Sequence, residues 1–549
     1  MHFISGMKKN GFFLFLGILI ISACQSFKKD NTKKVFRYNE AAGITSLDPA
    51  FSRNQANIWA CNQIFNGLVQ LNDKLEIKPC IAKKWKISQN GRLYTFYLRN
   101  DVFFHNSSIF KKGIGRKVTA HDVEYSFKRL TDPLLASAGA WVFNSVKKFG
   151  NDYAICALND TTLTIELHHA FPPFLGALST QYCSVIPHEA IQKYGTDFRR
   201  HPIGTGPFQF KMWKEGVKLV LVKNPRYFEF ENNKRLPFID AVAVTFITDK
   251  QAAFLEFVKG NLDFMSGIDP GYKDEILTRD GKLNPRYNDQ FYLTHQPYLN
   301  TEYLGILVDK NSDLSKASPL KLRKIRRAIS MGFDRKKMIL FLRNNIGTPG
   351  CYGFIPIGMP GFTTLPDYGY DYNPEKACQL LEEEGYKKGK KELMITLSTN
   401  ASYLDLCQYI QQQLGELGIK VKIEVSPPAT LREMIAQSKV EFFRGSWIAD
   451  YPDAENYLSL FYTDNFCPKG PNYTHFSHTQ FDNLFQEASS ELNDSARFLI
   501  YKQMDKIVME EAPVIILYYD QVLRFVRKNI SGLGSNPMNL LTLKRVKKG

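Results

Sequence analysis

The sequence lacks the short motifs that mark many enzyme classes. It has no GxSxG nucleophile elbow, no HExxH zinc motif and no GxxxxGK[ST] phosphate loop, and its nine cysteines include no CxxC pair. The formal net charge is +17, yet the basic residues are scattered along the chain rather than gathered in a long block. We therefore expect no metal, no cofactor, no ATP site and no nucleic-acid partner, and we read the positive charge as a basic surface that faces anionic lipid or envelope polymers.

The apolar run near the N-terminus is too short for a comfortable membrane span. Residues 11–21 are apolar, follow Lys8 and Lys9, and lead into Ser22, Ala23 and Cys24. This order of charge, apolar stretch and small residues resembles a bacterial lipoprotein signal, which implies cleavage before Cys24 and lipid on its sulfur. The alternative is a buried cysteine in an N-terminal helix. Loss of the two lysines lowers the formal charge from +17 to +15.

Length and composition are those of a large globular protein. The 549 residues are enough for two or three domains, and 44 % hydrophobic with 23 % charged residues is ordinary usage. The eight cysteines after Cys24 have spacings that name no disulfide partners, although an extracytoplasmic compartment permits disulfides.

Periodicity indicates an α/β protein. Residues 393–397 and 419–425 have strand patterns and flank a helical pattern over residues 401–417, so the order is β-α-β with parallel pairing. Thr119 is placed as the N-cap of another helix, with Asp122 three residues on. We attribute His121-Asp122 to the start of this helix rather than to a catalytic pair, because adjacent helical residues do not face each other.

One stretch concentrates side chains suited to binding. An apolar run over residues 440–443 leads into Arg444, Trp447, Asp450 and Tyr451, and Pro452 ends the strand or turn before it. We expect these four residues on a loop at a strand end, where binding groups are often placed. The simpler interpretation is a surface turn with one packed tryptophan.

An ordered set of motifs resembles one bacterial family. The set is Leu47-Asp48-Pro49, Phe65-x-Gly67-Leu68-Val69, Thr119-Ala120-x-Asp122-Val123, Gly204-Thr205-Gly206-Pro207 and Gly445-x-Trp447-x-Ala449-Asp450-Tyr451-x-Asp453. It is similar to the oligopeptide- and dipeptide-binding proteins of ABC importers (extracytoplasmic solute-binding family 5). The resemblance implies that Asp450 binds a peptide ammonium, that Arg444 serves peptide carboxylates, and that Trp447 and Tyr451 line the ligand site.

The resemblance also implies an architecture. It is a periplasmic-binding-protein-like α/β fold of two hinged lobes, with an extra domain inserted in the N-terminal lobe. We expect a signal peptide at 1–23, a tether at 24–34, an N-terminal lobe at 35–295, a second lobe at 296–510 and a return to the first lobe at 511–549. Pro427-Pro428, where relatives have a tryptophan, and the absence of glycine after His105 leave the pocket shape open.

The implied function is capture of small peptides rather than catalysis. The protein would be a lipid-anchored monomer in the cell envelope, on the periplasmic side of a bacterial membrane. It would deliver peptides to permease subunits driven by separate ATPase subunits. Three alternatives remain: the same fold with a non-peptide ligand such as glutathione, haem, a sugar or a nickel chelate; a secreted hydrolase; and an envelope adhesin or chaperone, which would show no saturable small ligand.

The lipid anchor is directly testable. Cells that express the wild-type chain and are fed radioactive palmitate should label it, whereas Cys24→Ser should carry no label, because the acylated sulfur and the cleavage site are both lost. Equal labelling of both forms would rule out the anchor.

Overall fold

The computed structural model describes residues 33–150, 152–268, 272–364 and 368–549. Cys24 and the tether up to residue 32 lie outside them. Among these described residues, no helix is long and apolar enough to cross a membrane.

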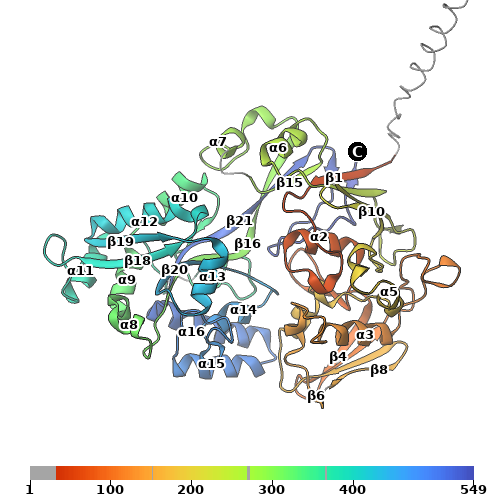
Figure 1. Ribbon diagram of the computed structural model, residues 1–549, viewed down its shortest axis with the longest axis horizontal. Helices are drawn as coiled ribbons and strands as arrows, with labels where there is room; N and C mark the ends of the chain where they lie inside the picture. The colour runs from red at the N-terminus through yellow and green to blue at the C-terminus, as the bar shows by residue number, and fades with distance from the viewer. Residues whose placement is uncertain (1–32, 151, 269–271, 365–367) are drawn as a thin grey trace, which may run out of the picture.

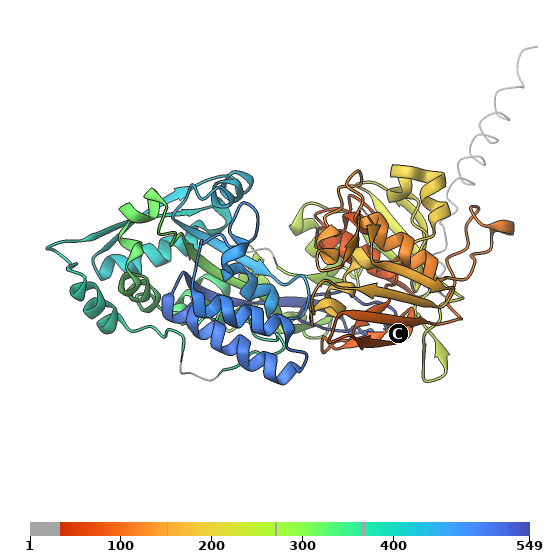
Figure 2. The same cartoon turned by 90° about the horizontal axis from the view of Figure 1, so that it is seen from below.

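Two lobes lie side by side and are joined by a pair of long strands. These are β16 (Phe291–Ile306) and β21 (Val514–Arg527), which cross from one lobe to the other (Figure 1). Figure 2 shows the same two masses and the same crossing strands from a perpendicular direction. The predicted α/β fold with two lobes is confirmed.

One sheet of eleven strands runs through both lobes. Its order is β10-β11-β14-β1-β15-β21-β16-β20-β18-β19, and β17 pairs with β21 beside this path. The remaining strands of this sheet are β1 (Val35–Asn39), β10 (Phe208–Lys214), β11 (Lys218–Lys223), β14 (Ala241–Thr245), β15 (Phe264–Ser266), β17 (Thr348–Pro349), β18 (Leu393–Thr399), β19 (Ile419–Val425) and β20 (Phe442–Ile448).

The crossing strands are antiparallel and change register midway. Pro297 lies opposite Gln521, and the next matched pair is Thr301 with Tyr519. Three residues of β16 therefore oppose one residue of β21, Asp520. A proline cannot donate a ladder hydrogen bond, so the break falls beside it. Extra residues of this kind bend the strand and increase its twist, and here they do so between the lobes.

The second lobe packs helices on both faces of its strands. The predicted β-α-β unit is confirmed: β18 and β19 are parallel, and α12 (Leu404–Glu416) connects them. One apolar core lies between the sheet and α9 (Arg323–Met331), α10 (Arg335–Arg343), α11 (Pro374–Glu383) and α12. The other lies between the sheet and α13 (Pro428–Ala436), α14 (Glu455–Leu458), α15 (Thr479–Ser490) and α16 (Asp494–Glu511).

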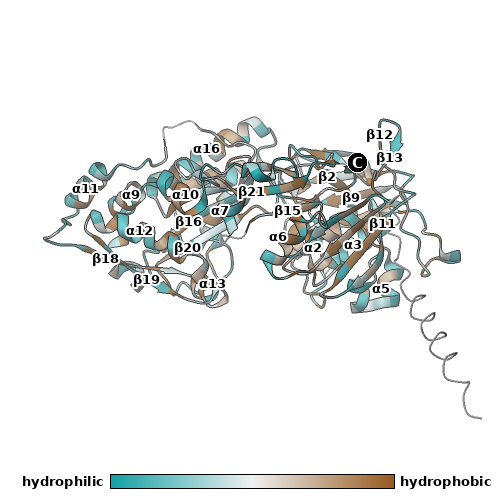
Figure 3. Cartoon of the chain, turned by 90° about the horizontal axis from the view of Figure 1, so that it is seen from above, coloured by the Kyte–Doolittle hydropathy of each residue, from teal (hydrophilic) through white to brown (hydrophobic). Residues whose placement is uncertain are grey.

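The N-terminal lobe contains an additional sheet, in the order β4-β5-β9-β8. Its elements are β4 (Ala82–Ser88), β5 (Leu93–Leu98), β8 (Ile155–Asn159), β9 (Thr162–Glu166) and the helix α3 (Ala120–Leu130). Alternate residues of β5 and β9 are buried, and Figure 3 shows brown, hydrophobic residues along β9 and the neighbouring strands. The sheet lies in the lobe for which the resemblance implies an inserted domain.

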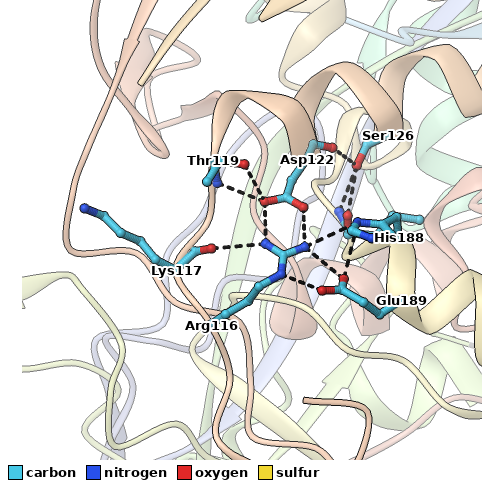
Figure 4. A network of polar contacts seen from close by, with 8 residues as sticks. Arg116, Lys117, Thr119, Asp122, Ser126, His188 and Glu189 are labelled. Carbon is cyan, nitrogen blue, oxygen red and sulfur yellow. Dashed lines mark hydrogen bonds and ion pairs between the residues drawn. The ribbon is translucent and has the colours of Figure 1, made fainter. Parts of the chain in front are cut away.

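The start of α3 confirms the capping interpretation. The Asp122 carboxylate accepts a hydrogen bond from the Thr119 N–H at 2.9 Å and forms a two-pronged ion pair with Arg116, at 2.6 and 2.8 Å (Figure 4). Arg116 also pairs with Glu189 on α5 (His188–Tyr194). His121 is exposed and lies 3.8 Å from Asp160, so His121 and Asp122 form no pair.

Five more α-helices lie among the described residues. They are α2 (Gln55–Ile64), α4 (Phe174–Leu178), α6 (Lys250–Val258), α7 (Lys273–Ile276) and α8 (Asp313–Ala317). Six short strands form separate hairpins: β2 (Val69–Leu71) with β3 (Ile77–Pro79), β6 (Lys148–Phe149) with β7 (Asp152–Tyr153), and β12 (Phe230–Glu231) with β13 (Lys234–Arg235). A last pair joins β22 (Ile530–Ser531) to β23 (Lys547–Lys548) near the C-terminus.

The turn before β10 requires glycine because it touches the end of α2. A Cβ added to Gly204 would lie 2.2 Å from the Ile64 carbonyl oxygen, and one added to Gly206 would lie 2.4 Å from the Ile64 carbonyl carbon. Both contacts are with backbone, which cannot rotate away. The glycines therefore fix the distance between α2 and the sheet, which explains the motif without any phosphate.

Gly204→Ala should destabilise the fold by about 2–3 kcal/mol, in the range of overpacked core substitutions, since the new methyl group must displace backbone. Gly415→Ala is the matched control: Gly415 lies in α12, and an added Cβ meets nothing within 4 Å. That change should be neutral or stabilising by up to about 1 kcal/mol. Urea unfolding measures both, and equal effects would contradict the packing account.

Candidate functional site

The predicted binding segment starts inside a strand. Arg444 and Trp447 belong to β20, whereas Asp450 and Tyr451 follow its end. The expectation that all four lie on a loop is therefore wrong for the first two. The cause is β16, which offers ladder partners for the whole of β20, from Ile306 opposite Phe442 to Asn300 opposite Ile448.

Arg444 lies on one face of β20, beside Glu302 of β16. Glu302 is directly opposite Ser446, so Glu302 and Arg444 are diagonal neighbours on one face of the sheet. They form an ion pair, with both side chains less than 10 % exposed. The Arg444 guanidinium also lies over the ring of Tyr403, with its central carbon 3.2 Å from the ring centre. Burial lowers the pKa of Arg444 to about 10, so the guanidinium remains charged at neutral pH.

Asp450 is held by an amide rather than by a cation. The Asn456 amide nitrogen donates to the Asp450 carboxylate at 3.3 Å, and the Asn456 oxygen accepts from the Asp450 backbone N–H at 3.1 Å. The Trp447 indole N–H donates to the same Asn456 oxygen at 3.1 Å. Asn456, at the start of α14, therefore fixes Trp447 and Asp450 together.

The Asp450 carboxylate faces the other lobe. The residue is exposed, but the protein around it removes enough hydration to raise the pKa of its carboxyl above 3.8, and the Asn456 bond offsets part of this rise. The charge of Asp450 affects the pKa of Tyr182 in the N-terminal lobe. Burial raises the pKa of Tyr182, nearby Asp450 raises it further, and Arg53 lowers it. Asp450 and Arg53 are therefore both close enough to Tyr182 for their charges to act on it.

Tyr451 makes a contact between the lobes. Its ring is buried, stacks on Trp141 with ring centres 5.6 Å apart, and meets Phe171 edge-on at 6.5 Å. Its hydroxyl donates to Glu455, and burial raises the pKa of Glu455 to about 7. In this structure Tyr451 packs in the core of the N-terminal lobe, so the predicted ligand role would require it to leave that core.

Two adjoining cavities share part of their lining, and the larger one borders the crossing strand β21. They have volumes of about 230 and 330 Å³ and share Gln55 and residues 266–268 as lining. The larger one is lined from both lobes, by Gln55 on one side and Arg343 on the other, with Asp520 of β21 at its base. A concave site between two lobes is a common position for a small-molecule ligand.

Sequence reasoning missed several residues of this site. Glu302 and Asn300 lie in β16, Asp520 lies in β21, and Asn456 and Tyr403 lie in helical segments. Glu302 carried one usable signal: it is a lone acid between Leu299 and Ile306, in a stretch that reads as a buried strand. The others carried none, because only the fold brings them together.

A second cluster lies away from this site, in the outer part of the second lobe. The Cys467 sulfur is 3.2 Å from Nε2 of His475, whose Nδ1 is 2.8 Å from Asp309. The sequence motifs did not indicate this cysteine–histidine contact, which the fold creates. Cys467 is 5 % exposed and Phe466 lies flat on the His475 ring, while His475 and Asp309 line a cavity of about 730 Å³. Among the described residues, no group of three or more His, Cys, Asp and Glu residues is placed to hold a metal.

The model for bacterial extracellular solute-binding proteins, family 5 middle region, matches residues 76–466, which is more than half of the chain. The chain belongs to this family.

The chain aligns with individual relatives over nearly the whole length of both proteins. The dipeptide-binding protein DppE of Bacillus subtilis (strain 168) is 26 % identical over 544 residues, covering 94 % of this chain and 92 % of that protein. The structure of HbpA2 from Haemophilus parasuis has a TM-score of 0.80 at 21 % identity, covering 94 % and 100 % of the two chains. The DppA protein of Helicobacter pylori, in complex with the peptide STSA, has a TM-score of 0.74 at 22 % identity, covering 95 % and 99 %. These structural likenesses confirm the fold.

The Glu455 pKa generates a pH prediction. An acid whose pKa is about 7 in the folded state and about 4.5 when unfolded retains its proton in the fold, so its contribution to stability is lost as pH rises from about 4.5 to 7. For Glu455 this loss is on the order of 3 kcal/mol.

Glu455→Gln should therefore reduce the fall in unfolding free energy between pH 5 and pH 7.5, as measured by urea unfolding. Other buried acids, such as Asp505, will keep part of the slope. Glu433→Gln on the surface of α13 is the control and should leave the slope unchanged. An unaltered slope in Glu455→Gln would contradict the burial argument.

Proposed function

We propose that this chain is the lipid-anchored peptide-binding component of an ABC importer. The observation that carries the proposal is Asp450: its carboxylate has no cation paired to it among the described residues, and its charge acts on Tyr182 of the other lobe. A ligand ammonium would supply the missing charge, and a desolvated ammonium needs such a fixed partner. Several named relatives, including DppE, support peptides as the first ligand class to test.

Capture would proceed by closure of the lobes. The register break at Asp520 lies on the two strands that cross between the lobes. These two strands are the natural bending points for a hinge. An extended peptide would lie against the end of β20, where the backbone can pair with it as an added strand. The loaded, closed form would dock on permease subunits that are driven by separate ATPases. We further propose the lobe boundaries 35–295, 296–510 and 511–549, a monomeric state, and attachment through Cys24 on the periplasmic side of the membrane.

A different ligand in the same cleft is the nearer alternative. Glutathione carries an ammonium and would satisfy Asp450 as a peptide does, whereas haem and nickel chelates would leave its charge without a partner. The charge of Asp450 therefore favours amine-bearing ligands within this fold.

A hydrolase is the more distant alternative, and the Cys467–His475–Asp309 cluster is the observation that favours it. Its connectivity is that of a nucleophile, a base and a residue that orients the base. If purified protein cleaved peptides and Cys467→Ala abolished the cleavage while peptide affinity stayed unchanged, that reading would replace ours.

Asp450→Asn tests the ammonium role, because it retains size and hydrogen bonding but removes the charge. Loss of one partner of a buried charge pair costs about 2–5 kcal/mol, so the affinity for free peptides should fall at least about 30-fold. N-acetylated peptides lack the ammonium. They should bind wild type weakly and lose little more in the variant, since effects on one shared interaction are not additive.

Calorimetry on both proteins with both ligands provides the measurement. Asn456→Asp is not a suitable control because it adds charge to the site; Asp464→Asn, on the surface of the same lobe, is matched in chemistry and should leave both affinities unchanged. Equal losses for free and acetylated peptides in Asp450→Asn would show that Asp450 acts on the fold rather than on the ammonium.

A further inference from the structure

The charges on the second-lobe side of the cleft are unevenly compensated. Arg343 and Arg444 each form an ion pair with an acid of a crossing strand, whereas Asp450 has no cation partner among the described residues. This asymmetry determines which end of a zwitterionic ligand the second-lobe side of the cleft can attract.

Arg444 is neutralised from within. Its partner Glu302 projects from a central strand, is 4 % exposed, and has both carboxylate oxygens occupied: one by Arg444 and the other by the Asn300 amide nitrogen at 3.0 Å. A buried acid on a strand between two paired neighbours has no route out to solvent. A ligand carboxylate at Arg444 would therefore lie beside the Glu302 charge rather than replace it, and like charges at that distance repel.

Arg343 is neutralised in the same way. It pairs with Asp520 at 2.9 Å, and Asp520 also accepts from the Asn300 amide nitrogen at 3.3 Å. Asn300 thus links the two pairs, Arg444–Glu302 and Arg343–Asp520. The two arginines and two acids sum to zero, and the strands of the hinge supply both acids.

From these pairings we infer that the cleft recognises a peptide by its ammonium and takes no account of its C-terminal carboxylate. The inference rests on the proposed peptide-binding function and refines it by naming the ligand class. A site that anchors one end and ignores the other does not fix the distance between the two charges. The protein then accepts peptides over a range of lengths instead of selecting one length by matching both ends.

Two further cations lie near the cleft, and binding of the ligand carboxylate by either one is the competing outcome. Lys273 donates to the Asn344 side chain at 2.7 Å and lines the larger hinge cavity. Arg53, on the N-terminal lobe near Tyr182, is exposed. If either one bound the carboxylate, affinity would depend on the C-terminal charge even with Arg444 and Arg343 neutralised.

The test uses the mature wild-type protein and the peptide Ala-Ala-Ala with a free or amidated C-terminus, measured by calorimetry. Amidation should change the affinity less than about fivefold, the range of a solvent-screened charge, while N-acetylation should weaken binding strongly. The affinity should change smoothly across the series of peptides from Ala-Ala to six alanines. A loss of tenfold or more on amidation, or one sharply preferred length, overturns the inference.

Glu302→Gln tests whether the Glu302 counter-ion is the reason that the C-terminal carboxylate does not affect binding. It removes the counter-ion with almost no change in shape, so Arg444 becomes an uncompensated cation, and the variant should prefer the free acid over the amide by at least about tenfold. Asp520→Asn, which releases Arg343, gives a second variant in case the first does not fold, as checked by circular dichroism. If both variants fold and neither gains the preference, the counter-ion account is wrong. If no peptide binds wild type under any condition, the proposed function fails, an outcome distinct from peptides that bind and discriminate by carboxylate.

Discussion

The pairing of β16 with β21 is the constraint on which the rest of the structure depends. These two strands are the centre of the eleven-stranded sheet and belong to both lobes, so the order of the lobes and the position of the cleft follow from their register. At the register break, the Asn300 amide nitrogen donates to the Asp520 carboxylate at 3.3 Å, so a side-chain bond joins the two strands there. Such a break costs ladder hydrogen bonds, and Asp520 also lines the larger cavity.

Electrostatics at the site follow from which charges these strands can supply. Glu302 and Asp520 are fixed on the hinge itself, so each neutralises an arginine brought by another element: Arg444 by β20, and Arg343 by α10. Asp450 lies beyond the end of β20, out of reach of both arginines, and is held by Asn456 alone. A buried ion pair contributes little net stability after desolvation, but it fixes geometry and removes local charge. The pairs therefore leave Asp450 as an acid for which the described residues supply no cation.

The sequence predicted the fold well and the site incompletely, for one physical reason. Local patterns such as the β-α-β unit and the Thr119 cap depend on neighbours in the chain, so periodicity and capping chemistry reveal them. Arg444 was placed on a loop because its strand partner, β16, is more than a hundred residues away. Glu302, the residue that neutralises the charge of Arg444, is equally distant in the sequence. A resemblance that transfers a role to Arg444 alone cannot show that this chain supplies its own counter-ion.

Tyr451 connects the ligand site to the motion that the site requires. It follows Asp450 directly, yet its ring is buried between Trp141 and Phe171 of the other lobe, and its hydroxyl is bonded to Glu455. Any rotation of the lobes that changes the distance between β20 and Trp141 must move this ring or take the Asp450 loop with it. Because Asn456 ties Asp450 to Trp447 in β20, the carboxylate is more rigidly attached to the second lobe than Tyr451 is. The same short segment thus holds the carboxylate for which a ligand role is proposed and an aromatic contact between the two lobes.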